Sequence, residues 1–597
     1  MKLLKIIKRY SRNLILPLIA VIVLTIGLNY IRSLIPLYIS KVFDILDGTN
    51  ESTLPGFINN LFAGHDVVDQ LIIVMVCIMI TALVRETINV ISDLTIAYTS
   101  EGIGYNIQTD FYNHVQELPY SYLNHTETGD LIQRSTSDIS RVKMFVGQSL
   151  PMMLTNIVQI VIYATQMLFI DLKLGGILLC GLPIILVISI VYHKKMSPTF
   201  RSMEENEGRL TTVVQENLTG IRVVKAFANE KEEIDKFDKT MTGYTSIWRK
   251  MMNRMSSYWA VCDCYSYSLM LLAFTLGVIF IINGELQLSQ VIGIFLYVEY
   301  IMWPTRSLGR LIGEMSRTNI ACSRILEIVE MKTEFEEANG TLKPEIKGDI
   351  VFENVSYQFA DASAPTIHDL NLSIRHGETI ALLGKTGAGK STMVSMLNRM
   401  LEATSGTIKI DGVDIKEIDK KYLRKNVGIV LQEPFLFSTT IAENIGIIQE
   451  KTDENIIKEV SDIASVRSDI EKFDSGFETI VGERGVTLSG GQKQRISIAR
   501  TLVERKPILV FDDSLSAVDT ETDVRIRKAL KERQAEATTI IITHRISTAM
   551  DADRIVVIED GTISEVGTFD ELVHKEGLLK NIWEIQNYFE DGKDGEQ

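Results

Sequence analysis

Long apolar runs alternate with charged stretches over the first half of the chain, whereas shorter and mixed runs fill the second half. A helix rises about 1.5 Å per residue, so roughly 20 apolar residues cross a bilayer core of about 30 Å. Runs of this length predict six membrane-spanning helices, at 14–40, 68–92, 146–169, 173–193, 259–283 and 288–310.

The hydrophobic pattern predicts a chain of two domains. Residues 1–330 are predicted to form an all-α transmembrane domain, in which 93–145 and 194–258 keep a helical period and extend from the membrane as two long cytoplasmic hairpins. Residues 331–348 are polar and contain Gly and Pro, which indicates a linker. Residues 349–590 alternate strand-like and helix-like patterns, as an α/β domain does.

Basic residues give the expected orientation in the membrane, because Lys and Arg concentrate in cytoplasmic loops. None occurs between Lys41 and Arg85 or between Arg254 and Arg306, whereas 194–254 carries twelve. Both termini and both long charged segments are therefore predicted to be cytoplasmic. The basic N-terminus leads into an apolar run that is too long for a secretory signal core.

Composition excludes some classes of protein. The net charge of −15 argues against a nucleic-acid binder, which needs a basic face. The five cysteines are too few and too scattered for a disulfide framework, and packing roles are expected for them.

The predicted α/β domain contains a glycine-rich turn with the pattern of a phosphate-binding loop. Gly384 to Ser391 fits G-x-x-x-x-G-K-[ST] and lies between an apolar strand and an amphipathic helix, the context that a phosphate-binding loop requires. Backbone N–H groups of such a loop surround the phosphates, the lysine reaches the terminal phosphates, and the serine hydroxyl binds Mg²⁺. The sequence thus predicts ATP and Mg²⁺ as ligands of Thr386, Gly387, Ala388, Gly389, Lys390, Ser391 and Thr392.

Later motifs make the domain resemble the ATPase of ABC transporters. "ILVF" leads to Asp512, an acid that holds Mg²⁺, and "TLSGGQKQR" contains Ser489, Gly490, Gly491 and Gln492 of a signature motif. The order of motifs in that family implies that Gln432 is the Q-loop glutamine, which binds Mg²⁺ together with Ser391 and Asp512. It also implies that Asp519 is the D-loop acid and that His544 is the switch histidine. Phe359 is the aromatic expected to stack on adenine, with Tyr357 as the alternative.

The membrane half resembles the same family. "ELPYSYLNHTETGDL" and "QENLTGIRVVKAFANE" are similar to the cytoplasmic segments that dock on the ATPase domains of bacterial exporter-type half-transporters. The resemblance implies an exporter fold that works as a dimer, in which two chains enclose two ATP molecules. Each site then combines the Lys390 loop of one chain with the Ser489 motif of the other.

Asp513 departs from the family pattern, in which the residue after the strand aspartate is usually a glutamate that polarises water. A carboxylate one methylene shorter predicts a site that binds ATP but hydrolyses it slowly, because about 1 Å of misplacement costs about 100-fold in rate. We therefore expect a heterodimer in which this chain supplies the slow site and an intact signature. A slow homodimer is the alternative.

The substrate is predicted less directly. Charged residues within a bilayer are costly, and Glu299, near the middle of the last predicted span, is expected with Trp303 to line a cavity for an amphipathic cation. ATP-driven export of hydrophobic or amphipathic compounds, lipid-like ones included, is the leading function, in a prokaryotic inner membrane. The alternatives are import of a metal chelate on the same fold, and an ATP-gated channel or sensor.

Overall fold

The structure is a computed structural model that describes residues 2–48, 54–337, 339–359, 362–449, 451, 453–482, 485, 487–515, 518–533 and 536–591. It divides into two compact units. Unit 1 comprises 1–116 and 128–331, and unit 2 comprises 117–127 and 332–597. The short segment 117–127 was expected within the first domain, but its contacts group it with unit 2.

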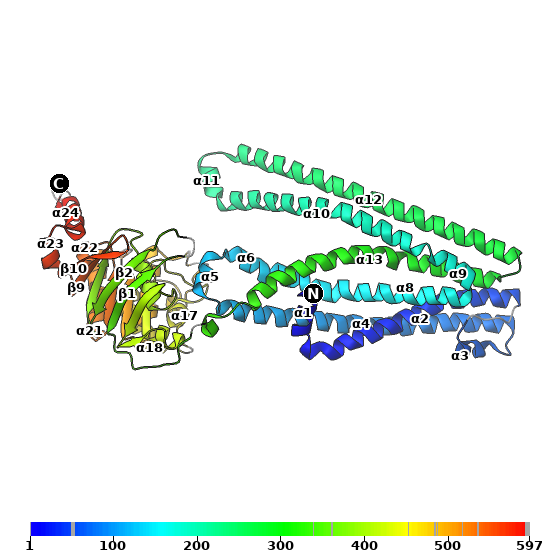
Figure 1. The fold of residues 1–597 in the computed structure, drawn as a ribbon, viewed down its shortest axis with the longest axis horizontal. Coiled ribbons are helices and arrows are strands. Elements are labelled where there is room, and N and C mark those ends of the chain that lie inside the picture. The colour runs from blue at the N-terminus through cyan, green and yellow to red at the C-terminus, as the bar shows by residue number, and fades with distance from the viewer. Residues whose placement is uncertain are drawn as a thin grey trace. The chain divides into compact units, whose positions relative to one another are not determined.

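Unit 1 is built of helices (Figure 1). The longer ones are α1 (Lys2–Tyr10), α2 (Ile15–Asp47), α4 (Val67–Gln116), α8 (Leu150–Ile170), α10 (Leu182–Thr219), α12 (Glu230–Ile282) and α13 (Leu288–Val329). Short elements join them: η1 (Arg12–Leu14), α3 (Gly56–Asn59), η2 (Asn60–Phe62), α6 (Thr128–Gln133), α7 (Ile139–Met144), α9 (Leu172–Leu179) and α11 (Ile221–Ala226). Two single turns of π-helix, Arg134–Asp138 and Phe145–Ser149, flank α7.

Within the described residues, five helical segments are long and apolar enough to cross a membrane: Arg12–Asp47, Val67–Gln116, Thr128–Ile170, Leu172–Thr219 and Glu230–Ile282. They contain the first four predicted spans and all of the fifth except its last residue. The sixth, 288–310, lies in α13, which is long enough to span a membrane but is not among these five segments. Many side chains of α13 are buried among its neighbours, so this helix needs less apolar surface than one that faces lipid.

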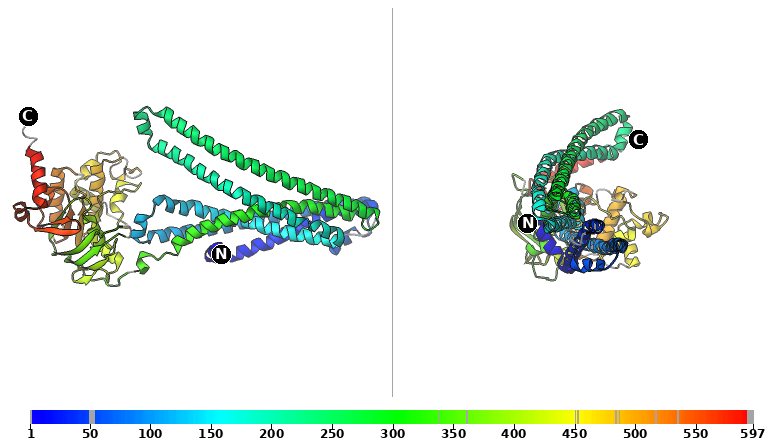
Figure 2. Two further views of the ribbon diagram at one scale, coloured as in Figure 1. Left: turned by 45° about the horizontal axis from the view of Figure 1, so that its top comes forward. Right: turned by 90° about the vertical axis from the view of Figure 1, so that its right-hand side faces the viewer.

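The core of unit 1 lies where α2, α8 and α13 pack together, and it includes Leu37, Tyr163 and Tyr297. The Tyr297 hydroxyl donates to the Ser33 carbonyl at 2.6 Å, which ties α13 to α2. The α10–α12 hairpin packs on α13 at one end and diverges from the other helices of unit 1 toward α11, as two views show (Figures 1 and 2).

Unit 2 contains two sheets. The first is antiparallel, in the order β2-β1-β4-β5, and consists of β1 (Ile350–Tyr357), β2 (Ile367–Ile374), β4 (Ser405–Ile410) and β5 (Val413–Asp414). The second has the order β10-β9-β3-β8-β7-β6 and consists of β3 (Thr379–Leu383), β6 (Val427–Val430), β7 (Ile508–Asp512), β8 (Thr538–Ile542), β9 (Arg554–Glu559) and β10 (Thr562–Gly567). It is parallel except at β10, and the parallel strands are almost entirely buried, as strands covered on both faces are.

Helices surround these sheets: α15 (Lys390–Leu397), α16 (Lys420–Asn426), α17 (Ile441–Gly446), α18 (Glu454–Ile463), α19 (Arg467–Ile470), α20 (Gly490–Leu502), α21 (Thr520–Arg533), α22 (Ile546–Ala549), α23 (Phe569–Val573) and α24 (Leu578–Asp591). The short η5 (Gly476–Glu478) and α5 (Tyr120–His125) also belong to this unit.

The predicted linker is anchored in unit 2. Its short helix α14 (Glu334–Glu337) begins with a carboxylate that accepts two hydrogen bonds from the Arg424 guanidinium, at 2.7 and 2.8 Å. Further along, Leu342 forms an isolated parallel bridge with Ile418. Much of the predicted linker therefore packs on the second unit.

Candidate nucleotide site

Three adjacent parallel strands bring the predicted phosphate-binding residues to one edge of the sheet. β3 leads into the glycine-rich loop, β7 ends at Asp512, and His544 follows β8. β8 lies between the other two strands, with Ile542 opposite both Leu382 and Asp512. A cavity of about 450 Å³ opens at this carboxyl edge, where α/β folds commonly bind ligands.

The cavity brings together eleven of the predicted residues: Phe359, Thr386, Gly387, Gly389, Lys390, Ser391, Thr392, Gln432, Asp512, Asp513 and His544. Ala388 belongs to the same loop, but its side chain is buried and does not line the cavity. Sequence reasoning missed Thr366 and Thr543, which also line the cavity. Thr543 directly precedes His544, so its position was available from the motif, whereas Thr366 carries no such signal.

Two glycines explain the loop's shape. At Gly384 φ is +151°, and a Cβ there would lie 2.2 Å from the Ile558 carbonyl oxygen, so a side chain does not fit. Gly389 adopts a φ of +97° as the residue before α15, and a Cβ would lie 3.1 Å from the Thr366 carbonyl oxygen. The backbone can therefore turn sharply and direct the free N–H groups of the first turn of α15 toward the cavity.

Ser391 and Asp512 meet in the cavity. The Ser391 hydroxyl donates to Oδ1 of Asp512 at 3.0 Å, although the two residues are far apart in sequence. Among the described residues no group of three or more His, Cys, Asp or Glu side chains could hold a metal ion. A hydroxyl and one carboxylate fit Mg²⁺, which usually binds to few protein oxygens and completes its shell with water and phosphate oxygens.

Lys390 occupies the loop itself. Its Nζ donates to the carbonyl oxygens of Gly384 and Lys385, each at 2.8 Å. Burial lowers the pKa of Lys390, and the nearby Asp512 and Asp513 oppose that shift. Burial raises the pKa of Asp512, and the Ser391 hydrogen bond opposes that shift. The cavity thus holds partly desolvated charges, an environment in which electrostatic attraction to phosphate is strong.

Asp513 faces His544 across the cavity. Asp513 has a left-handed backbone, with φ of +46°, and its N–H donates to the Ile542 carbonyl at 3.0 Å. Oδ1 of Asp513 lies 2.9 Å from Nδ1 of His544, a side chain that is 63% exposed. Asp513, the carboxylate that differs from the family pattern, is thus in contact with the predicted switch histidine. The sequence did not indicate this contact.

The aromatic residue at the cavity is Phe359. It is half-buried and packs edge-on against Tyr357, with ring centroids 4.9 Å apart. Tyr357, the alternative, belongs to the buried core and does not line the cavity.

The predicted signature residues lie outside this cavity. Ser489 caps α20: its hydroxyl accepts from the Gln492 N–H at 3.3 Å, and the Gln492 side chain accepts from the Ser489 N–H at 3.0 Å. Gly490 and Gly491 form the first turn of α20. Asp519 is exposed, and its side chain accepts from the Thr522 N–H at 3.0 Å, which lowers the pKa of that carboxyl.

The predicted substrate residues lie on the surface of α13. Glu299 is exposed, and Trp303 is 61% exposed and stacks on Trp259 with centroids 5.8 Å apart. Their role in substrate binding stays a prediction.

Comparisons with known proteins agree with this architecture. The family model "ABC transporter transmembrane region" matches residues 18–305, and the model "ABC transporter" matches 367–516. A Staphylococcus aureus protein, named as a candidate multidrug export ATP-binding/permease protein, is 32% identical over 560 residues, which cover 93% of this chain and 95% of that protein. The chain belongs to the ABC transporter family.

Other relatives of this ABC transporter come from Bacillus subtilis. YknU, named as an uncharacterised ABC transporter ATP-binding protein, is 33% identical over 81% of this chain and 83% of its own. YgaD, named as a candidate multidrug export ATP-binding/permease protein, is 33% identical over 82% and 85%.

A solved structure of a bacterial Atm1-family ABC exporter with ATP bound is similar in fold, with a TM-score of 0.81. The match covers 96% of this chain and 99% of that one, at 23% identity. The ABC transporter is thus a multi-pass membrane protein with an ABC ATPase domain and the fold of an exporter.

Proposed function

We propose that the chain is a half-transporter that uses ATP to export hydrophobic or amphipathic compounds. The observation that carries this proposal is the cavity of unit 2, which joins Lys390, Ser391 and Asp512 in a chain that also has a membrane-spanning helical unit. Relatives named as candidate multidrug export proteins support the direction of transport.

In the proposed reaction the glycine-rich loop binds the phosphates of ATP through backbone N–H groups, and the Lys390 ammonium exchanges its two carbonyl acceptors for phosphate oxygens. Ser391, Asp512 and Gln432 would hold Mg²⁺, which would neutralise charge on the phosphates. Phe359 stacks on the base. Asp513 points toward the attacking water but is one methylene too short to accept its proton effectively, and His544 orients Asp513 through the contact at 2.9 Å.

The active assembly is a dimer in this proposal. Ser489, Gly490, Gly491 and Gln492 lie outside the chain's own phosphate cavity, which supports their use at the site of a second half-transporter, with Asp519 nearby in that interface. ATP closes the dimer and hydrolysis reopens it, an alternating-access cycle. The shorter carboxylate of Asp513, already paired with His544, supports a slow site, and therefore a heterodimer whose partner carries a glutamate.

The proposed location is a prokaryotic cytoplasmic membrane with both termini inside, as the distribution of basic residues indicates. Direction is testable separately: an exporter accumulates a fluorescent amphiphile in inverted vesicles and excludes it from whole cells, whereas an importer does the reverse. Net uphill transport that depends on ATP turnover distinguishes a pump from an ATP-gated channel or sensor.

The experiment that tests the proposed site is steady-state ATP hydrolysis by the purified chain in lipid nanodiscs. The chain alone is expected to bind ATP and to turn it over well below about 1 s⁻¹, the low end for ordinary enzymes. Lys390→Ala should abolish binding, whereas Lys385→Ala, which removes an exposed lysine of the same loop that does not line the cavity, should not. Equal effects of both variants would contradict the assignment of the cavity.

A further inference from the structure

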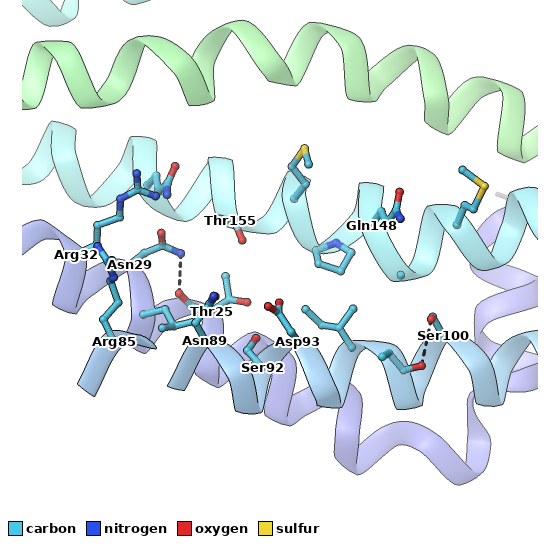
Figure 3. A pocket seen from close by; sticks show the side chains of 18 of the residues that line it. Thr25, Asn29, Arg32, Arg85, Asn89, Ser92, Asp93, Ser100, Gln148 and Thr155 are labelled. Atoms are coloured by element: carbon cyan, nitrogen blue, oxygen red, sulfur yellow. Dashed lines mark hydrogen bonds between the residues drawn. The ribbon is translucent and has the colours of Figure 1, made fainter. Parts of the chain in front are cut away.

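Two regions outside the nucleotide cavity bring polar side chains together. The first is a cavity of about 860 Å³ in unit 1, among α2, α4 and the segment from α7 to α8 (Figure 3). Its charged lining residues are three basic and three acidic ones, namely Arg32, Arg85, Lys143, Glu86, Asp93 and Glu101. Arg85 pairs with Glu86, and Lys143 pairs with Glu101. This cavity is balanced in charge and belongs to the unit that the proposed function assigns to transport.

The second region lies in unit 2, where α24 meets residues 544–546, the switch segment. The switch segment leads from β8 into α22 and contains the predicted switch histidine. The side-chain amide of Gln586 on α24 bridges its two ends. Nε2 of Gln586 donates to the His544 carbonyl at 2.8 Å, and Oε1 accepts from the Ile546 N–H at 3.0 Å. The C-terminal helix is therefore bonded to the backbone on both sides of Arg545.

This pair of hydrogen bonds requires a side chain that both donates and accepts. An amide does so with its NH₂ and C=O groups, whereas a carboxylate only accepts and a lysine or arginine only donates. The Ile546 N–H belongs to the first turn of α22, where backbone N–H groups have no acceptor within their own helix. Gln586 thus caps α22 from a different helix.

Helix α24 is anchored independently of Gln586. Leu579 is fully buried in an apolar cluster that also contains Leu383 of β3 and the Ile546 side chain. Trp583 packs against the same cluster. Leu579, Trp583 and Gln586 follow at intervals of four and three, so they share one face of α24. The apolar part of this face fixes the helix on unit 2, and Gln586 extends the same face to the switch segment.

The direction of the His544 side chain depends on the switch segment. This side chain is 63% exposed, so packing restrains it little. The rotamers that a side chain populates depend on the backbone dihedrals of its own residue. The contact of 2.9 Å between Nδ1 of His544 and Oδ1 of Asp513 therefore requires the backbone at His544 to keep its direction. Gln586 holds the carbonyl of that residue.

We propose that Gln586 is a positioning residue for ATP hydrolysis, which holds both ends of the switch segment and so keeps His544 directed at Asp513. Gln586 does not line the nucleotide cavity, and its effect passes through the backbone of the switch segment. This inference rests on the proposed function, and it extends the site to the C-terminal helix.

The first test measures hydrogen–deuterium exchange in the nucleotide-free, full-length chain in nanodiscs. Gln586→Leu keeps a side chain of similar size and removes both hydrogen bonds, so the Ile546 amide should exchange about tenfold faster. Glu584→Leu is the matched control. It places the same new side chain on α24 at an exposed residue that pairs with Lys580, and it should leave this amide unchanged. Unchanged exchange of the Ile546 amide in Gln586→Leu would overturn the proposal.

The second test measures single-turnover hydrolysis of radiolabelled ATP, an assay that resolves slow rates. Gln586→Leu should lower the rate about tenfold, as the loss of one hydrogen bond predicts, and leave the affinity for ATP unchanged. His544→Ala should lower the rate as well, and in that background Gln586→Leu should cost less than about twofold, since no imidazole is left to position. A further tenfold loss in that background would show a role in folding and not in positioning. A rate equal to wild type in His544→Ala would also overturn the proposal, because Gln586 acts through that side chain.

A third variant separates anchoring of α22 from positioning of His544. The carboxylate of Gln586→Glu still accepts from the Ile546 N–H but cannot donate to the His544 carbonyl. The Ile546 amide should therefore stay protected while the rate falls as in Gln586→Leu. A rate equal to wild type in Gln586→Glu would show that anchoring is sufficient and would overturn the positioning role. Because exchange is measured without ATP, a chain that hydrolyses no ATP refutes the proposed function and leaves the hydrogen bonds of Gln586 measurable.

Discussion

Replacing Asp513 by glutamate is the perturbation that bears most directly on the slow site. The added methylene moves the carboxylate by about 1 Å or more toward a water at the γ-phosphate, and a misplacement of that size is worth about 100-fold in rate. In free energy this is about 2.7 kcal/mol of the barrier. The backbone works against the change, since φ is +46° at Asp513 and aspartate tolerates this region better than most residues. That conformational cost is on the order of 1 kcal/mol of folding stability.

The expected result is a gain of function in which turnover of Asp513→Glu exceeds wild type by about 100-fold. The assay is phosphate release at saturating MgATP by the dimeric fraction in nanodiscs, beside titration with a fluorescent ATP analogue. ATP affinity should change little, because Lys390, Ser391 and Asp512 are untouched. Asp513→Asn is the matched control and should be about as slow as wild type. A large loss of rate in Asp513→Asn, with no gain in Asp513→Glu, would show that the aspartate is already an effective base and would refute the slow-site reasoning.

Three other variants test the domain's structure. Ser391→Ala removes the donor to Asp512 and should weaken ATP binding about tenfold in the presence of Mg²⁺ but little in EDTA, as titration with the analogue would show. Arg399→Leu should lower stability by about 3 kcal/mol in thermal unfolding of the full chain, since the buried guanidinium donates to the carbonyls of Ile415 and Ile418 at 3.0 Å each. Asp512→Asn should raise the unfolding temperature of the nucleotide-free protein at neutral pH. Burial raises the pKa of this carboxyl above its ordinary 3.8, so the unfolded chain binds fewer protons and the charged form destabilises the fold. The gain in unfolding temperature of Asp512→Asn should shrink as the pH falls toward 3.8, where the carboxyl becomes protonated in both states. A gain that does not change with pH would show that the charge of Asp512 is not its cause.

The cavity that gathers the predicted nucleotide-binding residues was largely predictable, because its motifs are local. The stretch from Gly384 to Ser391 contains both the glycines that permit the turn and the side chains expected to bind phosphate, so the sequence predicts the geometry of the loop. Asp512 was predictable because a buried strand ends there. The contact between Asp513 and His544 was not, because it joins the ends of two strands and depends on how the side chains orient across β7 and β8.

The sequence predicted the positions of the helices of unit 1 but not the cavity between them. Helix α2 begins at Ile15 and the first predicted span at 14, because a run of apolar residues defines both. The polar cavity was missed because charged residues were ranked by depth in the membrane rather than by the face of the helix. The spacing of Arg85, Asn89 and Asp93 already put these residues on one side of α4.

The charge balance of the unit 1 cavity has a consequence for the electrical energetics of transport. Moving one net charge across a membrane potential of about 100 mV changes the free energy by about 2.3 kcal/mol. The charged side chains that line the cavity, three basic and three acidic, sum to zero, so the walls themselves add no net charge to a change in the side of access. In the proposed export cycle, a dependence of the transport rate on voltage would therefore report the charge of the substrate and not that of the cavity walls.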